Sequence, residues 1–294
     1  MYGCIQEWFG FFAFELDWVW SVPGRAGLYF LDNGMMRKFS ILSDPAAFGI
    51  IMASTSVVML VMMLHLKKWK WKTGYALTAF FVILGVAYSG TRTAYFVIAA
   101  GVALYFLMNI SNKRTLVFAS ACLLGFAFIL YGPIYGNPTI NRIRSTFQFS
   151  EDASLKVRDE NRKFIQPYIY SNPIGGGLAT SGMAGLDYNP GHILAGFPPD
   201  SGFVKTAIET GWVGFSLQCL LYFLILQSGV RAYYRARNKF LRIVVLAALV
   251  SVFTFVIAQY GQEAIGQVPG CFLFYSCLAI IVRARQFETS NKHI

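Results

Sequence analysis

The residues of this sequence best suited to chemistry are arginines and carboxylates placed beside long apolar segments. Arg92 follows the polar turn Ser89-Gly90-Thr91 between two such segments. A turn with hydroxyls and backbone N–H groups at the start of a helix is suited to receive an anion. Snorkelling of a single Arg from a helix end would also explain this residue. Because a charge at such a boundary is costly, Arg92 is a candidate for function.

A second group of charges lies in a long connection between apolar segments. From residue 142 to residue 200 this connection holds six basic and six acidic side chains. On a helix through 154–168, Arg158 and Arg162 are four residues apart and share a face. The guanidinium fork suits phosphate better than the Lys ammonium does, which favours an anion site. The alternative is a solvated surface helix held by salt bridges.

The end of this connection carries the candidate general bases. Asp200 directly precedes an apolar segment, where it could take a proton or simply cap a helix. His192 is the reserve base, although a lone His in a loop is more often incidental. Glu209 can pair with Lys205 one turn earlier. The Gly-rich run 172–177 and the Gly/Ser/Thr-rich residues that follow it to Gly196 lack the Lys-Ser/Thr ending of a nucleotide-binding loop. This favours a flexible re-entrant or lid segment.

The elements that must position these residues are apolar helices. The chain is 56% hydrophobic and only 13% charged, whereas soluble domains are about 25% charged. Seven windows of 19 or more residues contain no Asp, Glu, Lys or Arg: 45–66, 73–91, 93–112, 115–141, 210–230, 243–262 and 264–282. Each can cross a hydrocarbon core of about 30 Å as a helix. We therefore predict an all-α, polytopic helical membrane protein with about seven transmembrane helices plus a large external loop with short helices.

The charges between these windows alternate from one connection to the next. One set of connections holds 14 of the 25 basic residues but only one of the 14 acidic ones, Glu288; the basic residues are Lys67, Lys68, Lys70, Lys72, Lys113, Arg114, Arg231, Arg235, Arg237, Lys239, Arg242, Arg283, Arg285 and Lys292. This is the positive-inside pattern, which predicts that these connections are cytoplasmic. The net charge of +11 is then a signal of topology, and we expect no nucleic acid as a partner.

The predicted organisation has four parts. They are an external N-terminal segment at 1–44, four transmembrane helices at 45–141, an external (periplasmic) catalytic loop at 142–209, and three transmembrane helices with a cytoplasmic tail at 210–294. The apolar start of the first part, residues 1–14, carries Glu7 and is too short to span. A chain that starts outside either translocates its tail or has lost upstream helices, and we expect the loss. The five cysteines form no CxxC or Cys/His cluster, so we predict neither a disulfide framework nor a metal site.

Four short motifs follow one another along residues 37 to about 216. They are Arg37-Lys38-Phe39-Ser40 with Ser43-Asp44-Pro45; Ser89-Gly90-Thr91-Arg92; Ser154 and Arg158 followed by Asn172-Pro173-Ile174-Gly175-Gly176-Gly177; and Asp200-Ser201-Gly202-Phe203 with Glu209, Gly211 and Gly214. In this order they resemble the O-antigen ligase and O-antigen polymerase family of bacterial polytopic membrane glycosyltransferases. The departures are Ala46 and Ser201 where the family has Asn, and Asp200 where ligases have His. Polymerases of the family more often tolerate other residues there, so both subclasses stay open.

The resemblance implies a glycosyltransferase at the outer face of the bacterial cytoplasmic (inner) membrane, acting in surface polysaccharide biosynthesis. The donor would be a glycan on undecaprenyl diphosphate, and the acceptor a growing glycan or lipid A core, within membrane lipid. The family is expected to invert the anomeric centre without a metal or cofactor. By this resemblance we assign Arg92 and Arg158 to the diphosphate, with Arg37 as a third ligand. Asp200 is the candidate base and His192 the reserve.

The chief alternative is a transporter or flippase of lipid-linked sugars. Such a protein would also place Arg near a diphosphate. It is expected to keep ionisable residues at the membrane midplane and to show repeated halves. All seven windows lack charge and the sequence shows no internal repeat, which favours the glycosyltransferase.

Overall fold

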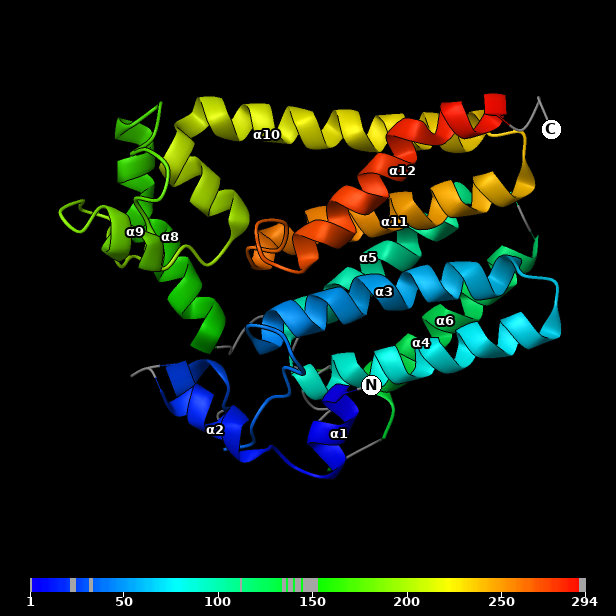
Figure 1. The fold of residues 1–294 in the computed structure, drawn as a ribbon, viewed down its shortest axis with the longest axis horizontal. Coiled ribbons are helices and arrows are strands. Elements are labelled where there is room, and N and C mark those ends of the chain that lie inside the picture. The colour runs from blue at the N-terminus through cyan, green and yellow to red at the C-terminus, as the bar shows by residue number, and fades with distance from the viewer. Residues whose placement is uncertain are drawn as a thin grey trace.

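The computed structural model describes residues 2–21, 25–31, 34–111, 113–133, 136, 140, 144 and 153–290 (Figure 1). Within these ranges every regular element is a helix, and the β structure is limited to two isolated bridges. The predicted all-α fold class is therefore confirmed for the described chain. The side chains of residues 153–158 lie outside what the structure describes, although their backbone is helical from residue 153.

The apolar windows of the sequence fold as helices. They are α3 (Pro45–His65), α4 (Trp69–Ser89), α5 (Arg92–Met108), α6 (Lys113–Tyr131), α10 (Gly202–Arg235), α11 (Lys239–Gly261) and α12 (Gly270–Ser290). Among the described residues, α3, α4, α10 and α11 are long and apolar enough to cross a membrane. α5 and the apolar part of α12 are shorter. The chain is thus a multi-pass helical membrane protein, but the predicted count of seven spans is not confirmed.

The helices pack around α11, which contacts α3, α5, α10 and α12. Its residues Leu249, Val252 and Phe255 are fully buried. A buried chain of hydroxyls links it to α3: the Thr254 Oγ1 donates to the Ser54 Oγ at 2.8 Å, and the Ser54 and Ser251 Oγ atoms lie 3.0 Å apart. Inside a bilayer, where water does not compete, such hydrogen bonds hold neighbouring helices together. This polar cluster in the described bundle is uncharged.

Short helices gather at the left and along the bottom of the bundle in Figure 1. They are α1 (Tyr2–Trp8), α2 (Ala13–Trp20) and η1 (Arg25–Leu28) from the N-terminal segment, with α8 (Ala153–Ser171) and α9 (Gly182–Tyr188) from the long connection. α1 packs on α4, and the buried carboxylate of Glu15 accepts bonds from Tyr2 and Gln6 at 2.9 and 2.7 Å. The N-terminal segment is thereby folded against the bundle.

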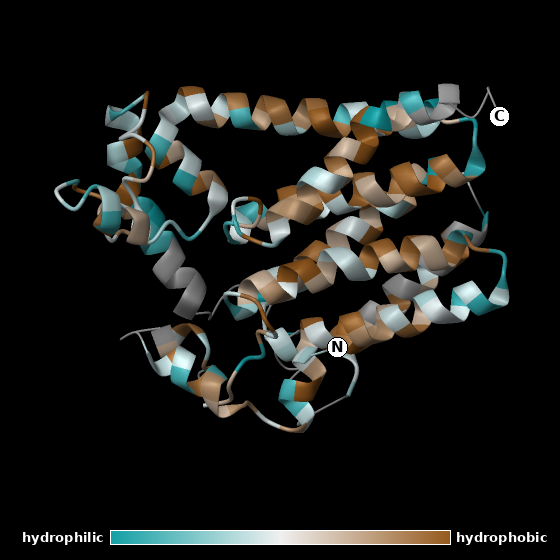
Figure 2. Ribbon diagram, viewed as in Figure 1, coloured by the Kyte–Doolittle hydropathy of each residue, from teal (hydrophilic) through white to brown (hydrophobic). Residues whose placement is uncertain are grey.

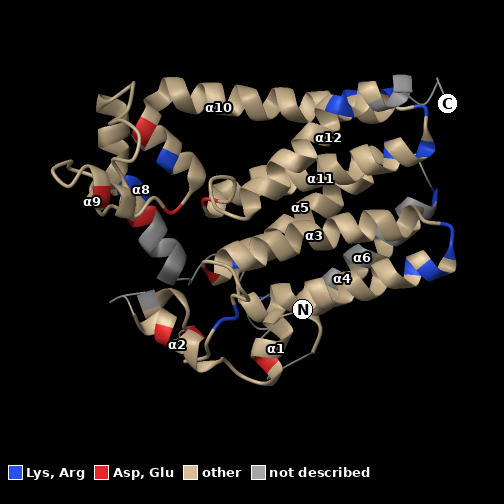
Figure 3. Ribbon diagram, viewed as in Figure 1, with Lys and Arg blue, Asp and Glu red and all other residues tan. Residues whose placement is uncertain are grey.

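Charge separates the two ends of the molecule. Hydrophobic residues dominate the long helices, and hydrophilic ones dominate their connections and the short helices (Figure 2). The Asp and Glu residues whose side chains are described all lie at the end that carries α1, α2, α8 and α9, whereas a group of Lys and Arg residues lies at the opposite end, where α3 meets α4 and α10 meets α11 (Figure 3). The tertiary structure thus collects at one end the basic residues on which the predicted sidedness rests.

Candidate active site

Arg92 opens α5 directly after a turn that is tied down by hydrogen bonds. Gly90 ends α4 in the left-handed conformation at φ 59°, which costs glycine little. The Thr91 Oγ1 donates to the carbonyl of Pro45 at 2.9 Å, and the Thr91 N–H donates to the Ser89 Oγ at 3.2 Å. Arg92 is the first helical residue and is half-buried. The conformation of Gly90 and the two hydrogen bonds of Thr91 therefore fix the backbone that leads into Arg92.

Arg37 reaches the same turn from the N-terminal segment. Its Nε donates to the Ser89 carbonyl at 3.0 Å, one terminal nitrogen donates to the Thr91 Oγ1 at 2.8 Å, and the other donates to the Leu28 carbonyl at 3.1 Å. These contacts give Arg37 a positioning role for the turn that leads into Arg92. Its assignment as a third diphosphate ligand stays a prediction.

One stripe of α8 contacts both candidate bases. The Asn161 side-chain amide donates to the Asp200 Oδ2 at 3.0 Å, and the Tyr168 hydroxyl lies 3.4 Å from the His192 Nε2. Because these α8 residues are seven positions apart, the two contacts are separated by about 10 Å along the helix. Position 158 lies one turn before Asn161, at the Asp200 end of the stripe. The Arg158 side chain itself lies outside the described residues.

Asp200 does not cap the helix that follows it. α10 begins at Gly202, and its N-cap residue is Ser201, so the capping interpretation of Asp200 is wrong. The Ser201 Oγ instead donates to the Gln259 carbonyl at 2.9 Å. Asp200 is half-buried, and in the described part of the chain its hydrogen bond comes from Asn161 on one carboxylate oxygen. A carboxylate held in this way by one oxygen can take a proton on the other.

His192 is held through both ring nitrogens. The Leu194 N–H donates to its Nδ1 at 3.2 Å, so in the neutral ring the proton is on Nε2 and faces Tyr168. Burial raises the pKa of Tyr168, which keeps this phenol protonated. His192 remains the reserve base candidate. Among the described residues, no three His, Cys, Asp or Glu side chains gather as metal ligands.

The end of α11 brings the separate motifs together. None of the four sequence motifs includes this segment. Gln259 accepts from Ser201, next to Asp200. Tyr260 lies under the Arg162 guanidinium, 4.9 Å from the ring centre. A Cβ atom on Gly261 would approach the Thr93 Oγ1 to 2.7 Å, so α11 and the start of α5 touch there. These three consecutive residues join α8, the start of α10 and the residue after Arg92.

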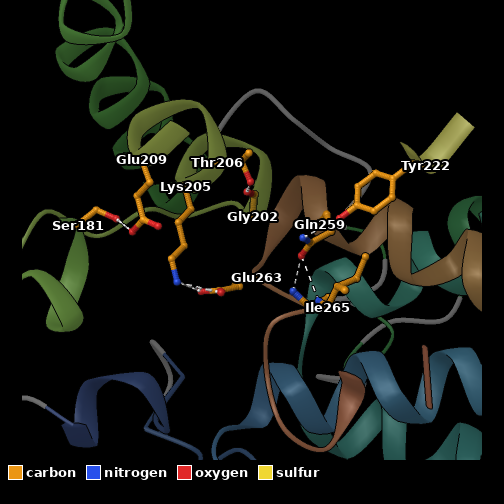
Figure 4. A network of polar contacts seen from close by, with 10 residues as sticks. Ser181, Gly202, Lys205, Thr206, Glu209, Tyr222, Gln259, Glu263 and Ile265 are labelled. Atoms are coloured by element: carbon orange, nitrogen blue, oxygen red, sulfur yellow. Dashed lines mark hydrogen bonds and ion pairs between the residues drawn. The ribbon is translucent and has the colours of Figure 1, made fainter. Parts of the chain in front are cut away.

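We call residues 259–263 the hub. The sequence carries a signal for it, because these residues interrupt the last long apolar stretch. Glu263 is the ionisable residue that separates the windows 243–262 and 264–282. In the structure the Lys205 Nζ lies 2.9 and 3.0 Å from its two carboxylate oxygens (Figure 4). The predicted pairing of Lys205 with Glu209 is therefore wrong. Glu209 is buried and accepts from the Ser181 Oγ at 2.8 Å.

The Gly-rich run packs against a break in α10 and is not a lid held away from the helix. Gly211 has φ 64° and ψ −167° inside α10, which frees carbonyls of the preceding turn. The Gly176 and Gly177 N–H groups donate to the carbonyls of Ile208 and Glu209, both at 2.9 Å. The run thus supplies the partners that a continuous helix would have supplied. This contact fixes the connection to the start of α10.

We expect Gly211→Ala to destabilise this junction strongly. Its backbone conformation is nearly exclusive to glycine and costs other residues about 1–3 kcal/mol. An added Cβ would also fall 2.0 Å from the Pro173 carbonyl oxygen. The melting temperature of the detergent-purified protein measures the effect. Gly191→Ala is the matched control, because that glycine has open space around it. Equal melting temperatures for both variants would contradict the role given to the break.

Comparison with known families found a match to the part of the chain that holds most of this arrangement. Residues 77–219 match the family model described as Wzy_C, O-antigen ligase. This part of the chain is therefore similar to an O-antigen ligase domain. The comparison with curated proteins found no match. The predicted resemblance to this family is confirmed over the matched residues, which make up just under half of the 294.

The O-antigen ligase domain includes most of the candidate site. Its range holds Arg92, Arg158, His192 and Asp200, and also the Gly-rich run with the break that it covers. Arg37 and the hub at 259–263 lie outside the matched range. The structure nevertheless joins both to the domain, through the Ser89–Thr91 turn and through Ser201.

Proposed function

We propose that this protein is a glycosyltransferase that acts at the outer face of the bacterial inner membrane on a glycan carried by undecaprenyl diphosphate. It transfers that glycan to a sugar hydroxyl, either of a growing glycan or of lipid A core. The observation that carries the proposal is the convergence of the Arg92 turn, the Asp200 segment and α8 on residues 259–261 of α11. The O-antigen ligase domain supports it.

The proposed reaction is a single displacement at the anomeric carbon. The acceptor oxygen bonds to that carbon as its bond to the diphosphate oxygen breaks, and the electron pair leaves with the lipid diphosphate. Arg92 and Arg158, with Arg37 as a third ligand, stabilise the negative charge on this leaving group. Such guanidinium stabilisation needs neither a metal nor a cofactor, and attack from the opposite face inverts the anomeric centre.

The proton of the acceptor hydroxyl goes to Asp200. Its contact with Asn161 places this carboxylate one α8 turn from position 158, which would bring acceptor and diphosphate close together. A base that takes the proton as the bond forms contributes about 10²–10⁴-fold to the rate. His192, which contacts α8 about 10 Å further along that helix, remains the reserve base.

Reconstitution tests the proposal directly. The full chain is placed in liposomes with undecaprenyl-diphosphate oligosaccharide, and lipid-linked products are separated by gel. Longer lipid-linked chains would identify a polymerase. Transfer only after addition of lipid A core would identify a ligase. Donor that moves to the opposite leaflet without any new glycosidic bond would overturn the proposal in favour of a transporter.

The orientation is tested by labelling single cysteines in intact cells, in a chain whose five native cysteines are replaced. Ile193→Cys in the long connection is highly exposed and should react with a membrane-impermeant maleimide. Arg237→Cys, between α10 and α11, should react only after the membrane is opened, because that connection is predicted to face the cytoplasm. The reverse labelling pattern would overturn the outer-face assignment.

A further inference from the structure

A second site lies at the basic end of the bundle, far from the candidate active site. Between α10 and α12 is an open cavity of about 310 Å³. Its lining includes Arg231 and Arg235, Ser228 one helical turn before Arg231, and the apolar residues Leu224 and Val282. The volume is at the lower limit of ligand sites, which suits a lipid headgroup rather than a whole lipid.

The position of this cavity along α10 matches the surface of a bilayer. From the break at Gly211 to Arg231 there are twenty residues of helix, or about 30 Å, which is the thickness of a hydrocarbon core. If the break lies at one boundary, Arg231 lies at the other, and Arg235 stands one turn further out. Leu224 is two turns deeper than Arg231. The cavity therefore extends from the headgroup layer into the hydrocarbon.

The described charges around the cavity are of one sign. Both arginines are exposed, and no residue at this end of the molecule whose side chain is described is Asp or Glu (Figure 3). Basic cavities between membrane helices on the cytoplasmic side are suited to anionic headgroups. The wall below the arginines is apolar, and Leu224 and Val282 are about half and two-thirds exposed, at 49% and 63%. An acyl chain would cover them, whereas a soluble phosphate would not.

We propose that this cavity binds an anionic glycerophospholipid of the inner leaflet. The phosphodiester accepts hydrogen bonds from Arg231 and Arg235, and one acyl chain lies along Leu224 and Val282. Guanidinium groups suit this role because their N–H groups match two phosphate oxygens at once. The site binds membrane lipid and is separate from the proposed glycosyl transfer, so it stands or falls independently of that activity.

The test measures lipid binding to the delipidated full chain in neutral detergent, by native mass spectrometry and by the rise in melting temperature. The probes are dioctanoyl phosphatidylglycerol, dioctanoyl phosphatidylethanolamine and inorganic phosphate. We expect phosphatidylglycerol to bind tightest. The double variant Arg231→Gln/Arg235→Gln should bind it at least about tenfold more weakly, as loss of hydrogen bonds to a charged group predicts. Ser228→Phe, which fills the cavity and keeps both arginines, should also weaken binding.

The matched control is Arg237→Gln/Lys239→Gln, which removes the same charge at the same end without touching the cavity lining. It should bind phosphatidylglycerol as the unmodified protein does. Equal weakening by the control would mean that only general surface charge attracts the lipid. Unchanged binding by Ser228→Phe, or stabilisation by inorganic phosphate equal to that by the lipid, would also overturn the proposal. If the double variant fails to fold, Ser228→Phe decides.

Discussion

Replacing Arg92 or Arg158 with alanine should abolish glycan transfer while the protein still inserts in the membrane at normal levels. In the proposed reaction these guanidinium groups stabilise charge that gathers on the diphosphate as the glycosidic bond breaks. Removing one donor that acts mainly on the transition state costs about 10²–10³-fold in rate. Arg92 stands at the start of α5, behind a turn held by Arg37 and Thr91, so its loss removes the charge and leaves the turn bonded.

Rates in reconstituted liposomes, at equal amounts of inserted protein, measure this effect. Lys163→Ala is the control for Arg158, because it removes one exposed positive charge from the same helix and should leave the rate near that of the unmodified protein. Arg92→Lys and Arg158→Lys keep the charge but lose the planar fork, and should recover part of the activity. Full activity of both alanine variants would refute the diphosphate assignment.

Replacing Asp200 with asparagine should also abolish transfer. Asparagine has nearly the same shape, and its amide oxygen can still accept the hydrogen bond from Asn161, so the start of α10 should keep its structure. What it cannot do is take the proton of the acceptor hydroxyl, which predicts a loss of about 10²–10⁴-fold. Asp200→His should retain part of the activity, because imidazole is a base that ligases of the family place at this position.

Two further variants separate catalysis from structure. Asp187→Asn removes an exposed carboxylate from α9 and should transfer glycan normally. His192→Gln should reduce activity less than Asp200→Asn, since His192 contacts α8 about 10 Å further along the helix. If Asp200→Asn behaves like the unmodified protein and His192→Gln does not, the base is His192 and the role of Asp200 is structural.

The sequence by itself was sufficient for the helical membrane fold and for the resemblance to the family. Long charge-free windows have few ways to satisfy their backbone in lipid other than a helix, so the hydropathy pattern and the fold class are directly linked. The motifs around Arg92, Arg158 and Asp200 are short and local, and the matched family range contains all three. Such features can be read from neighbouring residues alone. The number of spans is less determined, because helix ends depend on packing; α5 is only 17 residues long.

Only the tertiary structure decided which side chains meet. Lys205 pairs with Glu263, 58 residues away, rather than with Glu209 one turn away, because the end of α11 lies beside the start of α10. Glu209 turns instead to Ser181, and Asp200 to Asn161 rather than to its own helix. The break at Gly211 depends on a glycine-rich run that precedes it by more than thirty residues. A local pattern fixes which residues are able to bond, whereas the partner is chosen by the packing of whole helices.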